Sequence, residues 1–166
     1  MKYFGAIDQG TTSSRFIVFD ETGSIIKQHQ QEFTQHLPDE VSVEHDPNEI
    51  WESVLNCIKE VDKEFSIDQL DCIGITNQRE TTLAWRKSTA EPLHNALVWQ
   101  DTRTQNICDE LKEITKLEDS FTKTGLPIAT YFSLSKILWL LRNVDEVKKA
   151  REDSDLCFGT IDSWLL

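Results

Sequence analysis

The sequence predicts an α/β domain in which helices cover a sheet, and three observations support this prediction. The chain has 166 residues, about the length of one domain and enough to bury a substantial core. Its N-terminal region consists of short apolar runs of strand length, whereas further along the chain helical periodicities alternate with short strands. Strands followed by alternating helices and strands are typical of layered α/β folds.

Composition and charge exclude several classes of protein. The longest apolar run, Ile137 to Leu141, is far shorter than the roughly 18 residues of a membrane span. Asp8 interrupts the N-terminal apolar segment before a secretory signal could form. With 17 basic and 29 acidic residues the net charge is −12, which repels the phosphate backbone of nucleic acids. We therefore expect a cytoplasmic protein with no membrane span and no nucleic-acid partner.

The first elements predict an antiparallel meander of three strands followed by a helix. Apolar runs at Tyr3–Ile7 and Phe16–Phe19 have strand length, and the turn at 21–24 leads into a third stretch that ends at Phe33. Asp46, Pro47 and Glu49 then form a helix start, with a cap, a first-turn proline and a glutamate three residues after the cap. Its buried stripe comprises Ile50, Val54, Ile58, Val61 and Phe65.

The rest of the chain predicts further strands and helices. Cys72–Thr76 reads as a strand with Thr82–Trp85 as its pairing partner, and a third short strand ends at Val98 and Trp99. Helices are expected at 101–116 and 131–142, separated by a loop at 124–127 that glycine and proline define. The second helix would turn Leu134, Ile137, Leu138 and Leu141 inward.

The C-terminal segment predicts a strand at 156–159 and the first turn of a helix from Thr160. Native domains rarely end on bare apolar residues such as Trp164 and Leu165, so we expect the domain to be incomplete at this end. The cysteines and histidines show no metal-binding spacing. We expect the four cysteines (Cys57, Cys72, Cys108 and Cys157) to be reduced, buried thiols and the histidines to be structural or exposed.

The segment DQGTTSSR, residues 8–15, lies between the first two predicted strands. Gly10 lets the backbone approach a ligand closely, while the hydroxyl groups and guanidinium that follow it suit phosphate oxygens. A plain hairpin turn favours the same residues, so both readings remain open. Neither a P-loop nor a dinucleotide-binding glycine motif is present. The candidate phosphate ligands are Thr11, Thr12, Ser13 and Arg15, with Asp8 as a water-mediated magnesium ligand.

Two further segments place polar or aromatic residues after predicted strands. Arg79 and Glu80 would converge on one ligand only if the chain bends into a loop there, and a polyol needs both a donor and an acceptor. The alternative is a surface ion pair worth at most about 1 kcal/mol. Trp99 is either a pocket wall or a core aromatic, and the Tyr131 hydroxyl reaches a ligand or the solvent. Asp101 is a possible cap of the helix after it.

Taken in chain order, these segments resemble the FGGY carbohydrate kinases. The matching stretches span essentially the whole chain and comprise DQGTTSSR at 8–15, EFTQ at 32–35, VEHDPNEIWESV at 43–54, GITNQRET at 74–81, ALVWQDTRT at 96–104, TGLPIATYFSLSKILWLL at 124–141 and FGTIDSWLL at 158–166. The segments at 74–81, 98–103 and 125–141 are similar to those of family members that phosphorylate glycerol. Residues 38–42 depart from the family pattern, where a glycine followed by tryptophan is expected before Val43.

The resemblance implies the ribonuclease-H-like fold shared by actin and sugar kinases, with residues 1–166 as its N-terminal FGGY domain. It implies transfer of the γ-phosphoryl group of MgATP to glycerol by a homo-oligomeric full-length protein. It places the general base and the adenosine pocket beyond Leu166, so the chain alone would hold no catalytic base. The residue roles that it implies are ATP or ADP phosphate binding by Thr11, Thr12, Ser13 and Arg15, contact with the product phosphate by Thr11, magnesium at Asp8, and glycerol binding by Arg79, Glu80, Tyr131 and Trp99.

Two alternatives stay open at this point. The protein could be a kinase for another polyol or for a ketose, which would need a roomier pocket at Arg79, Glu80 and Trp99. A protein of another class, a non-catalytic actin-like module that binds nucleotides, would leave the polar groups at Arg79, Glu80 and Tyr131 without a use.

Overall fold

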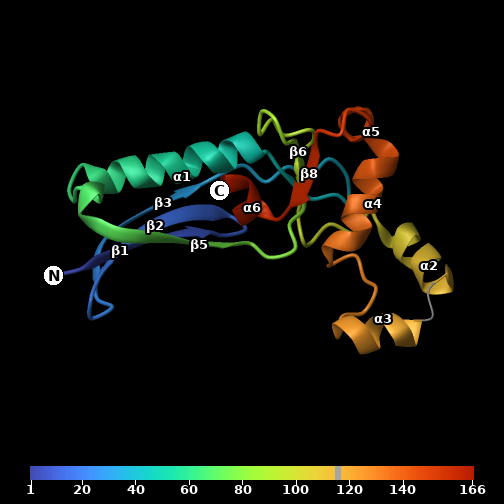
Figure 1. The fold of residues 1–166 in the computed structure, drawn as a ribbon, viewed down its shortest axis with the longest axis horizontal. Coiled ribbons are helices and arrows are strands. Elements are labelled where there is room, and N and C mark those ends of the chain that lie inside the picture. The colour runs from blue at the N-terminus through green and yellow to red at the C-terminus, as the bar shows by residue number, and fades with distance from the viewer. Residues whose placement is uncertain (115–116) are drawn as a thin grey trace.

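A four-stranded sheet forms one half of the molecule (Figure 1). The computed structural model describes residues 1–114 and 117–166. Strands β1 (Tyr3–Gln9), β2 (Ser13–Asp20) and β3 (Ile25–Glu32) form the predicted antiparallel meander. Strand β5 (Leu70–Asn77) joins β1 in parallel, which gives the order β3-β2-β1-β5. This register places Asp8 of β1 between Arg15 of β2 and Thr76 of β5.

Helix α1 (Pro47–Asp62) covers one face of this sheet (Figure 1). Its cap is as predicted, because the Asp46 side chain accepts a hydrogen bond from the Asn48 amide at 2.8 Å. Glu49, however, does not bond back to the cap. Its carboxylate accepts from the Thr34 amide at 3.0 Å and so ties α1 to the segment after β3. The core of this half combines buried positions of alternate strand residues with the inner stripe of the helix: Ile7, Phe16, Val18, Val54, Cys57 and Val61.

Strand β6 (Leu83–Arg86) does not pair with β5, so that prediction was wrong. It pairs antiparallel with β8 (Leu156–Gly159), while β4 (Glu44–His45) pairs with β7 (Ala96–Leu97). The physical reason is the turn between the strands, where Glu80 has a φ of +65° and the chain leaves the sheet. The Thr82 amide then bonds to the Leu97 carbonyl at 2.9 Å. A short 3-10 helix at Ile67–Gln69 precedes β5.

Helices α2 to α5 gather at the end of the molecule away from the N-terminus (Figure 1). The predicted helix at 101–116 begins only at Gln105, and its last two positions lie outside the described residues. Two helices that the sequence did not predict are present, α3 and α5. The helices are α2 (Gln105–Ile114), α3 (Leu117–Thr124), α4 (Ser133–Asn143), α5 (Asp145–Glu152) and α6 (Ile161–Leu165).

The inward face of α4 differs from the prediction. Leu134 is 54% exposed and lines an apolar hollow of about 160 Å³ with Leu126 and Phe132 of the preceding loop. Lys136 is fully buried on the same helix. Helical periodicity favours burial of Leu134. The structure instead buries Lys136, because backbone carbonyls accept hydrogen bonds from its ammonium group.

The cysteines are free thiols, but only some are buried as predicted. Cys57 and Cys108 are buried, and burial raises the pKa of the Cys57 thiol. Cys72 is exposed, because β5 is the last strand of the sheet and α1 covers only the other part of that layer. In the described part of the chain, no helix is long and apolar enough to cross a membrane.

Candidate functional site

A polar hollow of about 300 Å³ lies where four segments of the chain meet. The segments are the β1–β2 hairpin, the end of β5 with the turn after it, the turn after β7, and the stretch before α4. Its volume lies at the lower end of the range for small-molecule sites, which runs from about 300 to 1,000 Å³. The residues that line it are Gly10, Thr11, Asn77, Gln78, Arg79, Trp99 and Tyr131.

Trp99 is a wall of this hollow and not an ordinary core aromatic. Its indole Nε1 donates a hydrogen bond to Thr11 Oγ1 at 3.0 Å. The turn after β7 is therefore bonded directly to the β1–β2 hairpin. The Trp99 and Tyr131 rings lie 5.8 Å apart between centroids, and Tyr131 is 39% exposed. The two aromatic side chains therefore form an adjacent pair of apolar surfaces beside polar groups, which suits the carbon edge of a hydroxylated ligand.

The chain bends after β5, as convergence of Arg79 and Glu80 requires. Arg79 is exposed and lines the hollow. Glu80 does not line it: its Oε2 accepts from the amide and from the hydroxyl of Ser133, both at 3.2 Å. A non-glycine residue in the left-handed region costs about 1–3 kcal/mol, and the contacts at the start of α4 hold it there. The Glu80 carboxylate thus joins the turn to the segment that carries Tyr131.

The hairpin that carries the predicted phosphate ligands is closed by a hydrogen bond from the Gly10 amide to the Ser13 carbonyl at 2.9 Å. A Cβ atom on Gly10 would lie 3.2 Å from that carbonyl oxygen, so the turn is tight. Thr11 lines the hollow, and Thr12 is exposed at the tip of the hairpin.

Asp8, Ser13 and Arg15 lie on the sheet face opposite α1. They alternate along β1 and β2 with the residues buried beneath that helix. Gln30 of β3 binds two of them, donating to Ser13 Oγ at 2.9 Å and accepting from Arg15 Nε at 3.1 Å. The structure thus brings Thr11, Arg79, Trp99 and Tyr131 to one hollow and places Asp8, Ser13 and Arg15 on the adjoining open face.

Among the side chains of residues 1–114 and 121–166, no three histidine, cysteine, aspartate or glutamate groups converge as a metal site. His45 of β4 is fully buried, and its imidazole is hydrogen-bonded to Gln35 and Gln78. A magnesium ion at Asp8 would therefore need ligands from a nucleotide and water, which is how that ion is usually held.

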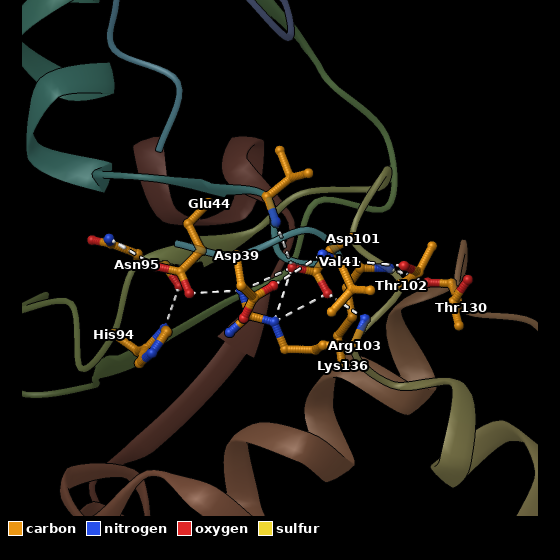
Figure 2. Close-up of polar contacts among 11 residues, drawn as sticks. Asp39, Val41, Glu44, His94, Asn95, Asp101, Thr102, Arg103, Thr130 and Lys136 are labelled. Carbon is orange, nitrogen blue, oxygen red and sulfur yellow. Dashed lines mark hydrogen bonds and ion pairs between the residues drawn. The ribbon is translucent and has the colours of Figure 1, made fainter. Parts of the chain in front are cut away.

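A buried ionic cluster follows Trp99, and the sequence did not reveal it (Figure 2). Arg103 pairs with Asp101 at 2.8 Å and with Glu44 of β4 at 2.7 Å, and its guanidinium lies 4.7 Å from the centre of the Trp139 ring. Asp101 also accepts from the amides of Val43 and Arg103, and α2 begins only at Gln105, so Asp101 does not take the possible role of its cap. Burial disfavours the charge of Arg103, but bonds to the two carboxylates outweigh it and raise the pKa of the guanidinium.

Lys136 of α4 is bonded to the segment that carries Tyr131, the other aromatic residue of the hollow, and Figure 2 shows it with Thr130 of that segment. Its ammonium group donates to the carbonyls of Thr130 and Tyr131, the latter at 3.1 Å. Burial lowers the pKa of Lys136 to about 8, although the negative charges of Asp101 and Glu80 act in the opposite direction. A lysine at an apolar helix position was the only signal for this contact, and it is a weak one.

The sheet and the position of the hollow define a class of protein. A meander extended by a parallel strand, with a polar hollow at the ends of those strands, is the arrangement of the actin-like N-terminal domains of sugar kinases. Residues 3–166 match the N-terminal domain of the FGGY family of carbohydrate kinases, and the chain belongs to that family.

Relatives and solved structures agree with this assignment. A protein of Borrelia garinii named glycerol kinase is 54% identical over 168 residues, which cover 100% of this chain and 34% of that protein. One of Staphylococcus haemolyticus with the same name is 52% identical, with 99% of this chain and 34% of that protein covered. The crystal structure of Plasmodium falciparum glycerol kinase with ADP superposes with a TM-score of 0.93 at 37% identity, over 99% of this chain and 33% of that one.

A more distant structure shows the fold alone. Xylulose kinase from Rhodospirillum rubrum has a TM-score of 0.85 at 17% identity, over 99% of this chain and 33% of that one. The chain therefore spans about a third of the length of the relatives and structures that it matches.

Proposed function

We propose that residues 1–166 form the N-terminal domain of an ATP-dependent glycerol kinase, which transfers the γ-phosphoryl group of MgATP to glycerol and yields sn-glycerol 3-phosphate. The observation that carries this proposal is the composition of the hollow. Thr11, whose hydroxyl group suits a phosphate oxygen, lines it together with Arg79, Trp99 and Tyr131. Relatives named glycerol kinase, at 50–54% identity, support glycerol as the acceptor.

Each side chain has a proposed role. Arg79 and Tyr131 donate hydrogen bonds to hydroxyl groups of glycerol, and Trp99 packs against its carbon chain. Glu80 does not line the hollow itself; next to Arg79, it would accept from a hydroxyl group through Oε1, since its Oε2 is bonded to Ser133. Hydroxyl groups need both donors and acceptors, and such a site rejects analogues that lack the hydroxyl. On the nucleotide side, Thr11, Thr12, Ser13 and Arg15 bind phosphate oxygens, and Thr11 also contacts the product phosphate.

Asp8 is proposed to hold magnesium through water, on the open face next to Arg15. When bound, the ion neutralises charge on the transferring phosphoryl group. This chain's own part is to place the hairpin donors and the acceptor hydroxyl in line, since phosphoryl transfer depends mainly on positioning and charge stabilisation. The general base and the adenosine pocket are assigned to chain outside residues 1–166, so we expect no turnover from these residues alone.

The test is a coupled measurement of ADP release by the full-length protein with saturating MgATP. Glu80→Ala should raise the glycerol KM at least about tenfold, because loss of a charge-assisted hydrogen bond costs roughly 1.5–3 kcal/mol. The matched control, Glu80→Gln, keeps an oxygen acceptor and should raise the KM less. An unchanged KM in Glu80→Ala would remove Glu80 from the site.

The hairpin is tested by Gly10→Val, in which the new Cβ meets the Ser13 carbonyl at 3.2 Å. We expect kcat to collapse while the fold largely survives, because the altered turn displaces the phosphate donors. Near-normal turnover would show that this segment is only a turn.

The same assay separates the alternatives. Faster turnover with another polyol or with a ketose such as xylulose would assign that substrate instead, and ADP binding without turnover on any of them would indicate a non-catalytic nucleotide-binding module. We also infer a cytoplasmic homo-oligomer that binds neither nucleic acid nor membrane. The net charge of −12 and the free thiols support the compartment and the exclusion of nucleic acid.

A further inference from the structure

A series of hydrogen-bonded amide and imidazole groups, one of which lines the hollow, joins its two sides. It begins at the hairpin carbonyl of Thr11, passes through Gln35 and His45 to Gln78, and returns through Gln9 to the carbonyl of Gly10. We call these four side chains, Gln9, Gln35, His45 and Gln78, the relay. Gln78 is the residue next to Arg79, so the relay runs from the proposed phosphate side to the proposed glycerol side.

The hydrogen-bond directions along the relay have a single solution. Gln35 donates its amide nitrogen to the Thr11 carbonyl at 3.1 Å, so its oxygen Oε1 faces His45 Nε2 at 2.7 Å. An amide oxygen only accepts, and therefore His45 Nε2 carries the proton. His45 Nδ1 is then an acceptor, and Gln78 Nε2 donates to it at 3.1 Å.

The return path uses the remaining groups of the same amides. Gln78 Nε2 donates its second hydrogen to Gln9 Oε1 at 3.2 Å, and its own oxygen accepts from the Thr81 hydroxyl at 2.9 Å. Gln9 Nε2 donates to the Gly10 carbonyl at 2.7 Å. Reversing any one amide would set donor against donor or acceptor against acceptor at its neighbour, so the orientation of each group depends on the others.

The relay is electrically neutral, and three of its four side chains are buried, while Gln35 is half-buried. His45 and Gln9 have no exposed surface, Gln78 is 5% exposed, and the Phe33 ring packs edge-on against the imidazole at 5.0 Å. Burial, with a contribution from His36, lowers the pKa of His45 to about 4, and Glu49 opposes the shift. The imidazole is therefore neutral near pH 7, as its position as both donor and acceptor requires.

We propose that His45 is a positioning residue that sets the distance between the nucleotide-binding hairpin and the glycerol-binding turn, acting through Gln35 on one side and Gln78 on the other. The proposal rests on the proposed function in naming the ligands of the two sides. It predicts that loss of one imidazole hydrogen bond weakens binding of ADP and that loss of the other weakens binding of glycerol. A residue that only packs in the core would not separate the two effects.

Two variants of His45 in the full-length protein cut the relay on opposite sides. The shorter amide of His45→Asn places its oxygen near the position of Nδ1 and can still accept from Gln78, but it does not reach Gln35. The longer His45→Gln can place its nitrogen near Nε2 and donate to Gln35, while its bond to Gln78 is lost. We expect His45→Asn to raise the Kd for ADP at least about fivefold with little change in glycerol KM, and His45→Gln to do the reverse.

The same changes at His29, half-buried on β3, should alter neither constant. Equal effects of both His45 variants on both constants, or no effect, would overturn the proposal. Gln35→Met removes the hydrogen bond to the Thr11 carbonyl and leaves the imidazole of His45 in place, with its bond to Gln78. It should reproduce the ADP effect of His45→Asn and so keeps the test decisive where a His45 variant fails to fold.

Two measurements separate this proposal from the proposed function. The imidazole nitrogen-15 spectrum of the wild-type protein should show a neutral ring with the proton on Nε2, unchanged between about pH 6 and 8. A ring protonated on Nδ1, or one that titrates in that range, would overturn the relay whatever the substrate. Absence of glycerol phosphorylation with the expected ring state and the expected ADP effect would overturn the substrate assignment and support the relay.

Discussion

The two halves of the molecule are stabilised in different ways. In the sheet half, formed by β1, β2, β3, β5 and α1, buried apolar residues such as Phe16 and Val61 lie where alternation and helical periodicity place them. In the other half, formed by β4, β6 to β8 and α2 to α5, an apolar core around Leu97 and Leu140 is accompanied by buried charges at Arg103, Asp101 and Lys136. The hollow lies between the halves, so each half positions part of the site.

The difference shows that the second half depends on specific polar contacts where the first depends on burial. A buried pair contributes little net stability over an apolar substitute, but removal of one partner leaves an uncompensated charge. We therefore expect the second half to be more sensitive to single charge changes than to loss of a methyl group, and the sheet half to be insensitive to charge.

The largest expected effect is that of Arg103→Met. Asp101 and Glu44 would keep their charges with side chains 0% and 9% exposed, and removal of a partner from such a pair costs about 3–5 kcal/mol of unfolding free energy. Urea denaturation of the chain measures this loss. The control is Arg142→Met, whose partner Glu110 is 52% exposed and whose loss should cost under about 1 kcal/mol. Similar losses in both variants would contradict the comparison.

The next effect is a pH dependence at the boundary between the halves. The unfolded state binds a proton at His45 near its ordinary pKa of 6.5, whereas the folded state does so only near 4. The stabilisation is therefore complete above about pH 6.5 and is lost as the pH falls toward 4, by about 3 kcal/mol in total. Denaturation as a function of pH should show this slope in the wild type. If His45→Asn keeps the same slope between about pH 6.5 and 4.5, other groups are responsible for it.

A smaller loss is expected in the sheet half from Val61→Ala. Val61 is fully buried beneath the sheet, so truncation removes apolar contacts and leaves a small cavity, at a cost of about 2 kcal/mol. This loss should not change with salt concentration or between about pH 5 and 8. Val147→Ala, equally buried in the other half, sharpens the comparison, because an equal cost there would show that packing is similar and that only the charges differ.

These differences explain what could be predicted from the sequence. The meander and the capped start of α1 follow from local rules, because turn residues and apolar spacing are visible in the chain. The partner of β6 could not be predicted. A left-handed turn at Glu80 directs the chain away from β5, and β6 then pairs with β8, which lies 70 or more positions further along the chain. Local periodicity predicted Leu134 to be buried, whereas the structure buries Lys136. The carbonyls that accept its hydrogen bonds belong to the loop directly before α4, and helical periodicity says nothing about the path of that loop.

For the same reason, only part of the candidate site could be predicted from the sequence. Thr11, Arg79, Trp99 and Tyr131 could be named from their motifs and the family resemblance, and the structure brings them to one hollow. The relay behind them could not be, since Gln9, Gln35 and His45 are common polar residues whose partners lie on other elements. Nothing in the spacing of Asp101 and Arg103 indicates Glu44 as their shared neighbour.

The smallest expected effect comes from a hydrogen bond at the hollow that joins the two halves directly, from Trp99 to Thr11. Trp99→Phe keeps an aromatic wall next to Tyr131, with the present ring separation of 5.8 Å, but removes the Nε1 donor to Thr11 Oγ1. The freed hydroxyl can turn toward other partners, so the unfolding free energy should change by less than about 1 kcal/mol. The loss should instead appear in nucleotide binding, as an increase of about fivefold in the Kd for ADP, because Thr11 no longer has a fixed orientation. Isothermal titration of the full-length protein measures this, with Trp51→Phe on the exposed side of α1 as the control. An unchanged affinity would mean that the hairpin is held by the sheet half alone, whereas a loss equal to that of Trp99→Ala would mean that the indole nitrogen, and not the ring, is what the second half contributes to phosphate binding.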